Sequence, residues 1–317
     1  MKYRIRRFTP LTFSVAFVMI CILASQLNGC STYLSARRAT KKVTRDLVTF
    51  DDDLVKSVGI VRFENWSYYR RDNIEKIFQN KLTETLGSAC SHLLLARPED
   101  ENYPDFLVEL PPRIADRIDN LNLALLGRQY GFDAIATGAI VSISAFKEKR
   151  GLFWLRDTHS FIQIQIMVKV FDTETGAKLV DENFIHELEV DETDYEFVRA
   201  KKPTTIVEIP EALKYIASIM GEKICDAISA QPWKSYVISK QGKRIIISCG
   251  SRSGIRQNMV FKVYNASRLI KGVEEQQFFL PGPETGEIRI TYAHPDFAEA
   301  IVIADHGIQV GDAVKAK

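Results

Sequence analysis

The sequence lacks a large excess of charge of either sign. Its 42 lysines and arginines nearly balance 40 aspartates and glutamates, and the formal net charge is +2. A protein that binds nucleic acid mainly through electrostatics carries a strong basic excess, so net charge gives that function no support. The sequence also has no low-complexity tract and no internal repeat at a period of about 20–50 residues, which argues against a solenoid or a propeller.

Cysteine is scarce, with five residues in 317. Cys21 and Cys30 belong to the N-terminal segment, and Cys90, Cys225 and Cys249 lie far apart. Metal sites usually need ligands at short, regular spacing, and the five histidines are scattered, so we expect no metal site. A disulfide between Cys90 and Cys225 is possible in an oxidising compartment. Buried free thiols are the simpler prediction.

Long apolar runs are absent except for residues 11–24. This run is shorter than the roughly 20 residues that a membrane-spanning helix needs. Its length and its positively charged start are those of a secretory signal peptide. The basic residues before the run are Lys2, Arg4, Arg6 and Arg7.

The five residues LNGCS follow this run and resemble the lipobox of bacterial lipoproteins, with Leu27, two further residues and then Cys30. The resemblance implies cleavage after the small Gly29 and covalent lipid on Cys30. Ser31 is not an aspartate, so the inner-membrane retention signal of enterobacterial lipoproteins is absent and the outer membrane is favoured. The alternatives are an uncleaved anchor or an ordinary secretory signal. In each case the remainder faces an extracytoplasmic space.

Composition and hydrophobic periodicity divide the chain into four parts. Residues 1–29 are the expected signal peptide, and residues 30–56, first basic and then acidic, are an expected tether. Residues 57–230 alternate strand and helix patterns, which predicts an α/β domain with a mixed sheet and three helices. Residues 231–317 contain short strands separated by glycine, which predicts a small barrel or sandwich. The fold class is therefore α+β.

Strands of the α/β domain are predicted at 58–63, 92–96, 134–146, 161–171 and 178–190. Three helices are predicted: one opened by a capping box of Asp72 and Glu75, one from about Arg113 to Gly131, and one that begins at Pro210. Residues 191–207 are polar and predict a loop. In the β-domain, strands are predicted at 244–248, 259–264, 286–292, 298–304 and 312–314.

Three stretches carry a resemblance to a known domain: 58–65 (VGIVRFEN), 130–138 (YGFDAIATG) and 170–180 (VFDTETGAKLV). They are similar to the opening strand, a helix-to-strand turn and a hairpin of the periplasmic domain shared by the TolB N-terminal region, the middle domain of flagellar assembly protein T (FlgT) and curli-export lipoproteins of the CsgG type. Residues 245–312 resemble the small β-domain that ends FlgT-like proteins. The order of both domains favours the FlgT-like proteins, although these have an additional N-terminal domain where this chain has a lipobox and a tether.

No arrangement of residues predicts catalysis. His294-Pro295-Asp296 matches the tripeptide of J-domains, but strands flank it here, so a turn is expected. Residues 250–254 (GSRSG) lack the lysine of a phosphate-binding loop. The acidic residues of 191–196 lack the glycine and the spacing of a calcium loop, which favours a solvated loop. We expect no enzyme activity and no cofactor apart from the covalent lipid on Cys30.

Two loops are candidates for contact with a partner or a membrane. One is the expected hairpin tip formed by Leu152, Phe153, Trp154 and Leu155 between basic residues. Leaving a large apolar side chain in water costs about 1.5–3 kcal/mol, and a partner, a lipid surface or the protein's own sheet would cover these four. The other follows the first strand and carries aromatic residues typical of interface anchors: Trp66, Tyr68 and Tyr69.

These features predict a non-enzymatic outer-membrane lipoprotein that faces the periplasm and binds other envelope proteins, with homo-oligomers among the expected partners. The resemblance to FlgT makes a structural or assembly factor of the flagellar basal-body ring the best candidate. The alternatives are a subunit of a CsgG-like export pore and a lipoprotein that binds an envelope synthase or a glycan. Acidic residues on both faces of 178–190 argue against the pore, because a strand that crosses a bilayer needs an apolar outward face.

Overall fold

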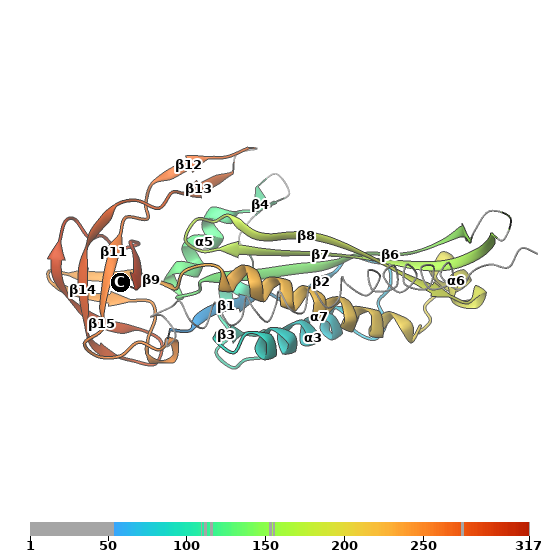
Figure 1. The fold of residues 1–317 in the computed structure, drawn as a ribbon, viewed down its shortest axis with the longest axis horizontal. Helices are drawn as coiled ribbons and strands as arrows, with labels where there is room; N and C mark the ends of the chain where they lie inside the picture. Colours follow the sequence, from blue (N-terminus) through green and yellow to red (C-terminus); the bar gives the residue numbers. More distant parts are fainter. Residues whose placement is uncertain are drawn as a thin grey trace, which may run out of the picture. The chain divides into compact units, whose positions relative to one another are not determined.

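The structure is a computed structural model (Figure 1). It describes residues 54–108, 110, 113–114, 117–151, 154, 156–273 and 276–316. The expected signal peptide, Cys30 and nearly all of the expected tether lie outside the described residues. In the part that is described, no helix is both long enough and apolar enough to cross a membrane. The fold is α+β, with a mixed sheet covered by helices and a closed six-stranded barrel.

The mixed sheet has the strand order β3-β1-β6-β7-β8. Its strands are β1 (Lys56–Ile60), β3 (Leu93–Ala96), β6 (Ala134–Arg150), β7 (Asp157–Asp172) and β8 (Lys178–Val190), and the short β2 (Glu64–Asn65) also pairs with β6. β1 is parallel to β3 and β6, whereas β6, β7 and β8 form an antiparallel meander. The five predicted strands are present, but the first runs over Lys56–Ile60 instead of the predicted 58–63. The apolar face predicted for 161–171 is buried throughout: Ile162, Ile164, Ile166, Val168 and Val170.

Two long helices, α3 (Ile74–Ala89) and α7 (Glu208–Ser229), lie side by side along one face of this sheet (Figure 1). Phe78 of α3 and Ile216 of α7 are fully buried in one cluster with the apolar face of β7. This cluster is the main core of the α/β domain. The opposite face of β8 stays open, and Ile185 is 53% exposed there.

The predicted N-terminal signals of these helices need correction. The capping box of Asp72 and Glu75 is absent, because Asn73 takes the N-cap position in a left-handed conformation (φ 48°) without a side-chain cap. Asp72 instead accepts a hydrogen bond from the Tyr69 hydroxyl (3.3 Å). Helix α7 begins at Glu208, which places Pro210 inside its first turn.

The helix predicted from Arg113 is wrong in its first half. Arg113–Ile114 (β4) and Arg117–Ile118 (β5) form a short antiparallel hairpin, and α5 (Asn120–Gln129) begins only after it. Asp119 is the true N-cap, because its side chain accepts a hydrogen bond from the Asn122 backbone N–H (3.0 Å). Apolar residues four apart fit a tight hairpin as well as a helix, which is why the pattern misled. Gly131 follows the helix with φ +73°, as predicted.

Helices also occupy two stretches where no helix was predicted. The polar segment expected to be a loop contains α6 (Glu192–Arg199), and α4 (Asp105–Val108) is a single turn. Asp191 caps α6 by accepting a hydrogen bond from the Asp194 N–H (2.9 Å). The acidic residues expected in a solvated loop therefore belong to a helix and its cap, and Glu192 and Asp194 lie in its first turn, where the helix dipole stabilises negative charge.

The C-terminal part is a barrel, one of the two predicted alternatives, with the closed order β10-β15-β14-β11-β16-β9. The strands are β9 (Lys234–Gln241), β10 (Arg244–Ile247), β11 (Val260–Tyr264), β14 (Glu284–Ala293), β15 (Ala298–Asp305) and β16 (Ala313–Ala316). Strand β9 and a hairpin of β12 (Leu269–Lys271) and β13 (Gln277–Phe279) were not predicted. Residues 250–254 hold a 3-10 turn, Ser251–Ser253, between two strands, and the His294 tripeptide is a turn between β14 and β15.

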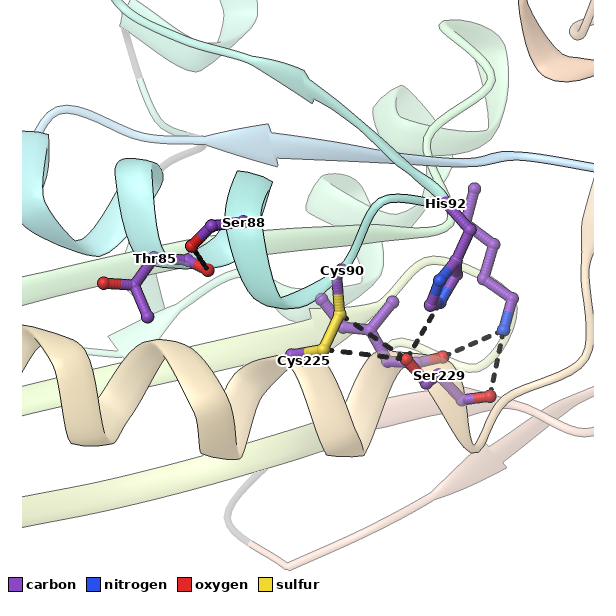
Figure 2. Close-up of a disulfide and its surroundings, with 8 residues drawn as sticks. Thr85, Ser88, Cys90, His92, Cys225 and Ser229 are labelled. Atoms are coloured by element: carbon purple, nitrogen blue, oxygen red, sulfur yellow. Dashed lines mark hydrogen bonds between the residues drawn. A yellow bond between two sulfur atoms is a disulfide. The ribbon is translucent and has the colours of Figure 1, made fainter. Parts of the chain in front are cut away.

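Cys90 and Cys225 are joined in a disulfide, with their Cα atoms 5.9 Å apart (Figure 2). The prediction of free thiols is therefore wrong for this pair and correct for Cys249, which is free and buried. Cys90 follows the last residue of α3, and Cys225 lies in the final turns of α7. The disulfide closes because the two helices run side by side, which the sequence spacing did not reveal.

Candidate functional site

The tip of the β6–β7 hairpin is the first candidate site, and Trp154 is the described residue at its centre. Arg150 and Asp157 are the last paired residues of the two strands, and Trp154 between them is 89% exposed. Leu152, Phe153 and Leu155, predicted as contact residues with Trp154, lie outside the described residues. The structure thus places an exposed tryptophan at the end of two long strands.

The base of this tip is held by charged and aromatic contacts. The Arg150 guanidinium donates hydrogen bonds to Glu148 (2.8 Å) and Glu187 (2.6 Å), and it lies 3.9 Å from the centre of the Phe161 ring. Lys147 pairs with Glu192 of α6 at 2.6 Å. Exposed pairs of this kind contribute at most about 1 kcal/mol each, and backbone pairing of β6 with β7 continues as far as Arg150 and Asp157.

The aromatic loop after β1 is less available than the sequence suggested. Tyr69 is only 2% exposed, and its hydroxyl accepts a hydrogen bond from the Ile206 N–H (3.1 Å). The Tyr68 hydroxyl is buried without a hydrogen-bond partner among the described residues, and burial raises the pKa of Tyr68 to about 12. Trp66 is 45% exposed and donates a hydrogen bond to Glu64. Only Trp66 of these three offers a large exposed side chain.

A buried ionic cluster joins the α/β domain to the barrel, and sequence reasoning missed it. The Lys234 ammonium at the start of β9 pairs with Asp172 at the end of β7 and lies 4.0 Å from Glu174. Lys315 of β16 pairs with Glu174 at 2.6 Å. Burial opposes ionisation of Asp172, but Lys234 and hydrogen bonds from Thr175 outweigh it and lower the pKa of Asp172.

Asp133, just before β6, is a second carboxyl group at this junction. It is 2% exposed and accepts hydrogen bonds from the backbone N–H groups of Ser57 (2.8 Å) and Lys234 (3.3 Å). Burial raises the pKa of Asp133 to about 7, although the nearby positive charge of Lys234 acts in the opposite direction. The carboxyl group thus ties β1 and β9 to the start of β6.

Arg128 of α5 completes the junction. Its guanidinium donates hydrogen bonds to the carbonyl oxygens of Thr173 (3.0 Å), Glu174 and, in the barrel, Ala266 (2.9 Å). The same group lies 3.7 Å from the centre of the Phe279 ring. Three segments far apart in the sequence therefore meet at one buried cation, which has a structural role here.

Ser229 and His92 lie beside the disulfide, with Ser229 Oγ 3.0 Å from His92 Nε2, a pairing of residue types that catalytic sites also use (Figure 2). The same serine oxygen lies 3.6 Å from Cys90 Sγ, and the serine carbonyl accepts a hydrogen bond from the buried Lys56 ammonium (3.2 Å). These contacts close the C-terminal end of α7, so we assign the pair a structural role. Among the described residues, no group of three histidines, cysteines or carboxylates could hold a metal ion.

No protein-family model matches the chain, and no curated protein matches it. Solved structures do show likeness. The hypothetical protein CT253 from Chlamydia trachomatis is 12% identical with a TM-score of 0.32, covering 56% of this chain and 99% of that one. Lipoprotein GNA1162 from Neisseria meningitidis is 10% identical with a TM-score of 0.27, covering 54% and 99%. TolB from Acinetobacter baumannii is 8% identical with a TM-score of 0.28, covering 77% and 57%. At these values none of the matches assigns the chain to a family.

Proposed function

We propose that this protein is a non-enzymatic lipoprotein that is anchored in the outer membrane, faces the periplasm and binds other envelope proteins. The observation that carries the binding role is Trp154, 89% exposed at the end of the β6–β7 hairpin. Burying an aromatic side chain of this size is a large source of interface energy. The Cys90–Cys225 disulfide supports an oxidising compartment outside the cytoplasm.

In this proposal, lipid on Cys30 sets the distance of the folded part from the membrane. The α/β domain presents the hairpin tip to a partner, and the barrel supplies a second surface. The buried contacts of Lys234 and Arg128 hold the barrel to the α/β domain, so a partner bound to one would be positioned relative to the other. The best candidate for the whole assembly is a structural or assembly factor of the flagellar basal-body ring.

The hairpin tip is tested by the double replacement Phe153→Ala and Trp154→Ala in the full chain. We expect recovery of cross-linked envelope partners to fall at least tenfold, with an unchanged circular dichroism spectrum. Tyr215→Ala is the matched control, because Tyr215 is 58% exposed on α7, away from the tip. Equal recovery with wild type and the double variant would refute the role of the tip.

The anchor is tested by Cys30→Ser. We expect wild type to fractionate with the outer membrane and the variant to appear in the soluble periplasmic fraction, with no lipid mass on the purified chain. A variant that remains in the outer membrane would contradict the anchor.

The flagellar assignment is tested separately: deletion of the protein should remove a ring from isolated basal bodies and abolish swimming.

A pore subunit remains the second candidate function, because β6 and β7 are unusually long, with 17 and 16 residues. Strands of about 9–11 residues are enough to cross a bilayer. The acidic residues on β8 and the pairing of Glu182 with Lys223 of α7 at 2.6 Å weigh against this role. Stable channels in planar bilayers containing the purified lipoprotein would favour the pore, whereas absence of conductance would favour the binding role.

A further inference from the structure

A cleft of about 620 Å³ opens on the sheet face opposite α3 and α7, and it belongs to neither the hairpin tip nor the buried junction. Its walls are formed by strands β7 and β8 with their connecting turn, by β5 of the β4–β5 hairpin, and by β13 with the residue before it. Its charged lining residues are Arg117, Lys169, Lys178 and Asp181, and Phe278 contributes an aromatic wall. We call this space the oxyanion cleft.

Lys169 is the central charge of the oxyanion cleft. Its cross-strand neighbour on β8 is Asp181, the carboxylate best placed to neutralise it. Asp181 instead accepts a hydrogen bond from Lys178 at 2.6 Å. Within the part of the chain that the structure describes, no carboxylate lies within 4.0 Å of the Lys169 ammonium. This half-buried cation has no ion pair of its own.

Further positive charge gathers around Lys169. Arg117 lines both the oxyanion cleft and a smaller cavity of about 70 Å³, and that cavity is shared by Lys169 and Arg113. Burial lowers the pKa of Lys169, and Lys178, Arg113 and Arg117 lower it further, whereas Asp181 acts in the opposite direction. A nearby negative charge favours the charged form of an ammonium group, so an anion bound beside Lys169 would be stabilised by this cation.

We propose that the oxyanion cleft binds a small ligand that carries a carboxylate or phosphate group on an aryl body. Lys169 and Arg117 hold the oxyanion, since ammonium and guanidinium groups form strong charge-assisted hydrogen bonds to carboxylate and phosphate oxygens. Phe278 contacts the aryl body. The volume lies within the range of roughly 300–1,000 Å³ that is usual for small-molecule sites.

The direct test is calorimetric titration of the full chain with phenyl phosphate and with benzoate, and the comparison between them distinguishes phosphate from carboxylate as the preferred group. We expect Lys169→Gln and Arg117→Gln each to weaken binding at least tenfold. Asp181→Asn should tighten binding several-fold, because it removes a carboxylate that lines the cleft beside Lys169. Lys223→Gln, on the helix-covered side of the sheet, is the control and should leave binding unchanged.

Two further probes make the proposal falsifiable. Inorganic phosphate should bind more weakly than phenyl phosphate, because it lacks the aryl body, and benzylamine should not bind. Unchanged affinity in Lys169→Gln with an intact circular dichroism spectrum would overturn the proposal, as would equal affinity for inorganic phosphate and phenyl phosphate. This site is independent of the hairpin tip, so the Phe153 and Trp154 replacements should leave the titration unaffected.

Discussion

Asp133 carries a carboxyl group whose burial favours the protonated form. It lies where β1, β6 and β9 meet, with two backbone N–H groups as its donors. Its motif, GFDA, was recognisable in the sequence as a helix-to-strand turn. Its burial was not predictable, because the turn is enclosed by Lys234, about 100 positions later in the chain.

The stability of the folded protein should depend on pH through Asp133. The pKa of Asp133 is raised to about 7 from an unfolded value near 3.8. At a pH between these two values, Asp133 is therefore protonated in the folded state and ionised in the unfolded state. The stability that this proton contributes is complete below about pH 4 and is lost as pH rises through 7, with a slope of at most about 1.4 kcal/mol for each pH unit. Asp133→Asn should abolish this slope.

Urea denaturation at pH 4.5, 6 and 8 measures the effect. Other groups titrate in the same range, so the informative quantity is the difference between wild type and Asp133→Asn at each pH. We expect that difference to move in favour of the variant as pH rises. A constant difference over the three values would contradict the assignment of a raised pKa to Asp133.

Gly131 and Gly242 allow a matched comparison of two turns. Both have positive φ, +73° and +59°, which an alanine adopts at a cost of about 1–2 kcal/mol. A Cβ on Gly131 would also collide with the Ser248 backbone of the barrel, whereas nothing lies within 4 Å of one on Gly242. We expect Gly131→Ala to lower the free energy of unfolding by at least about 2 kcal/mol more than Gly242→Ala does. Equal losses in chemical denaturation would show that the close approach is absent.

At the scale of the elements, most strands of the sheet and barrel were predictable, whereas strand β9, the β4–β5 hairpin and helix α6 were not. Strand β7 and the barrel strands β11, β14 and β15 follow from alternation and glycine spacing. The β4–β5 hairpin was mistaken for a helix, because two isoleucines four apart satisfy both structures and tertiary packing decides between them. Helix α6 was missed because its N-cap, Asp191, was interpreted as part of a loop.

The disulfide between α3 and α7 should contribute substantially to the free energy of unfolding. It closes a sequence separation of 135 residues, and removal of a native disulfide typically costs about 2–5 kcal/mol. We expect the double replacement Cys90→Ala and Cys225→Ala to lose free energy of unfolding in that range. A reducing agent should destabilise wild type to the same extent and leave the double variant unchanged. Two additional reactive thiols after reduction of the denatured wild type would confirm the disulfide. An unchanged number of thiols would refute it.

At the scale of the whole molecule, the sequence indicated two domains but not how firmly they are joined. The joining residues come from α5, from the β7–β8 turn and from the barrel, and no local pattern marks them as neighbours. The position of the hairpin tip was predictable, because β6 and β7 end on either side of Trp154. Its exposure was not, because the sequence also allowed the protein's own sheet to cover it. The oxyanion cleft was not, because its cations come from separate strands.

The junction itself can be weakened by Lys234→Met. This change leaves Asp172 and Glu174 buried without the Lys234 ammonium, and removing one partner of a buried pair costs about 3–5 kcal/mol. Lys240→Met is the control, because Lys240 pairs with Asp305 at the surface, at 2.7 Å, where a pair contributes about 0–1 kcal/mol. Urea denaturation at pH 7 should separate the two variants clearly. Losses of equal size would mean that the buried cluster does not join the domains.

The separation of Cys90 from Cys225 also bears on how the chain is made. A polypeptide emerges from its N-terminus, so Cys90 is present as a thiol while the following 135 residues are still missing. Cys249 is synthesised shortly after Cys225, so Cys90 could pair with either of these two thiols. Burial raises the pKa of Cys249 to about 12 and keeps its thiol unreactive once the barrel has docked beside Gly131. Docking of the barrel therefore withholds Cys249 from exchange with the Cys90–Cys225 disulfide.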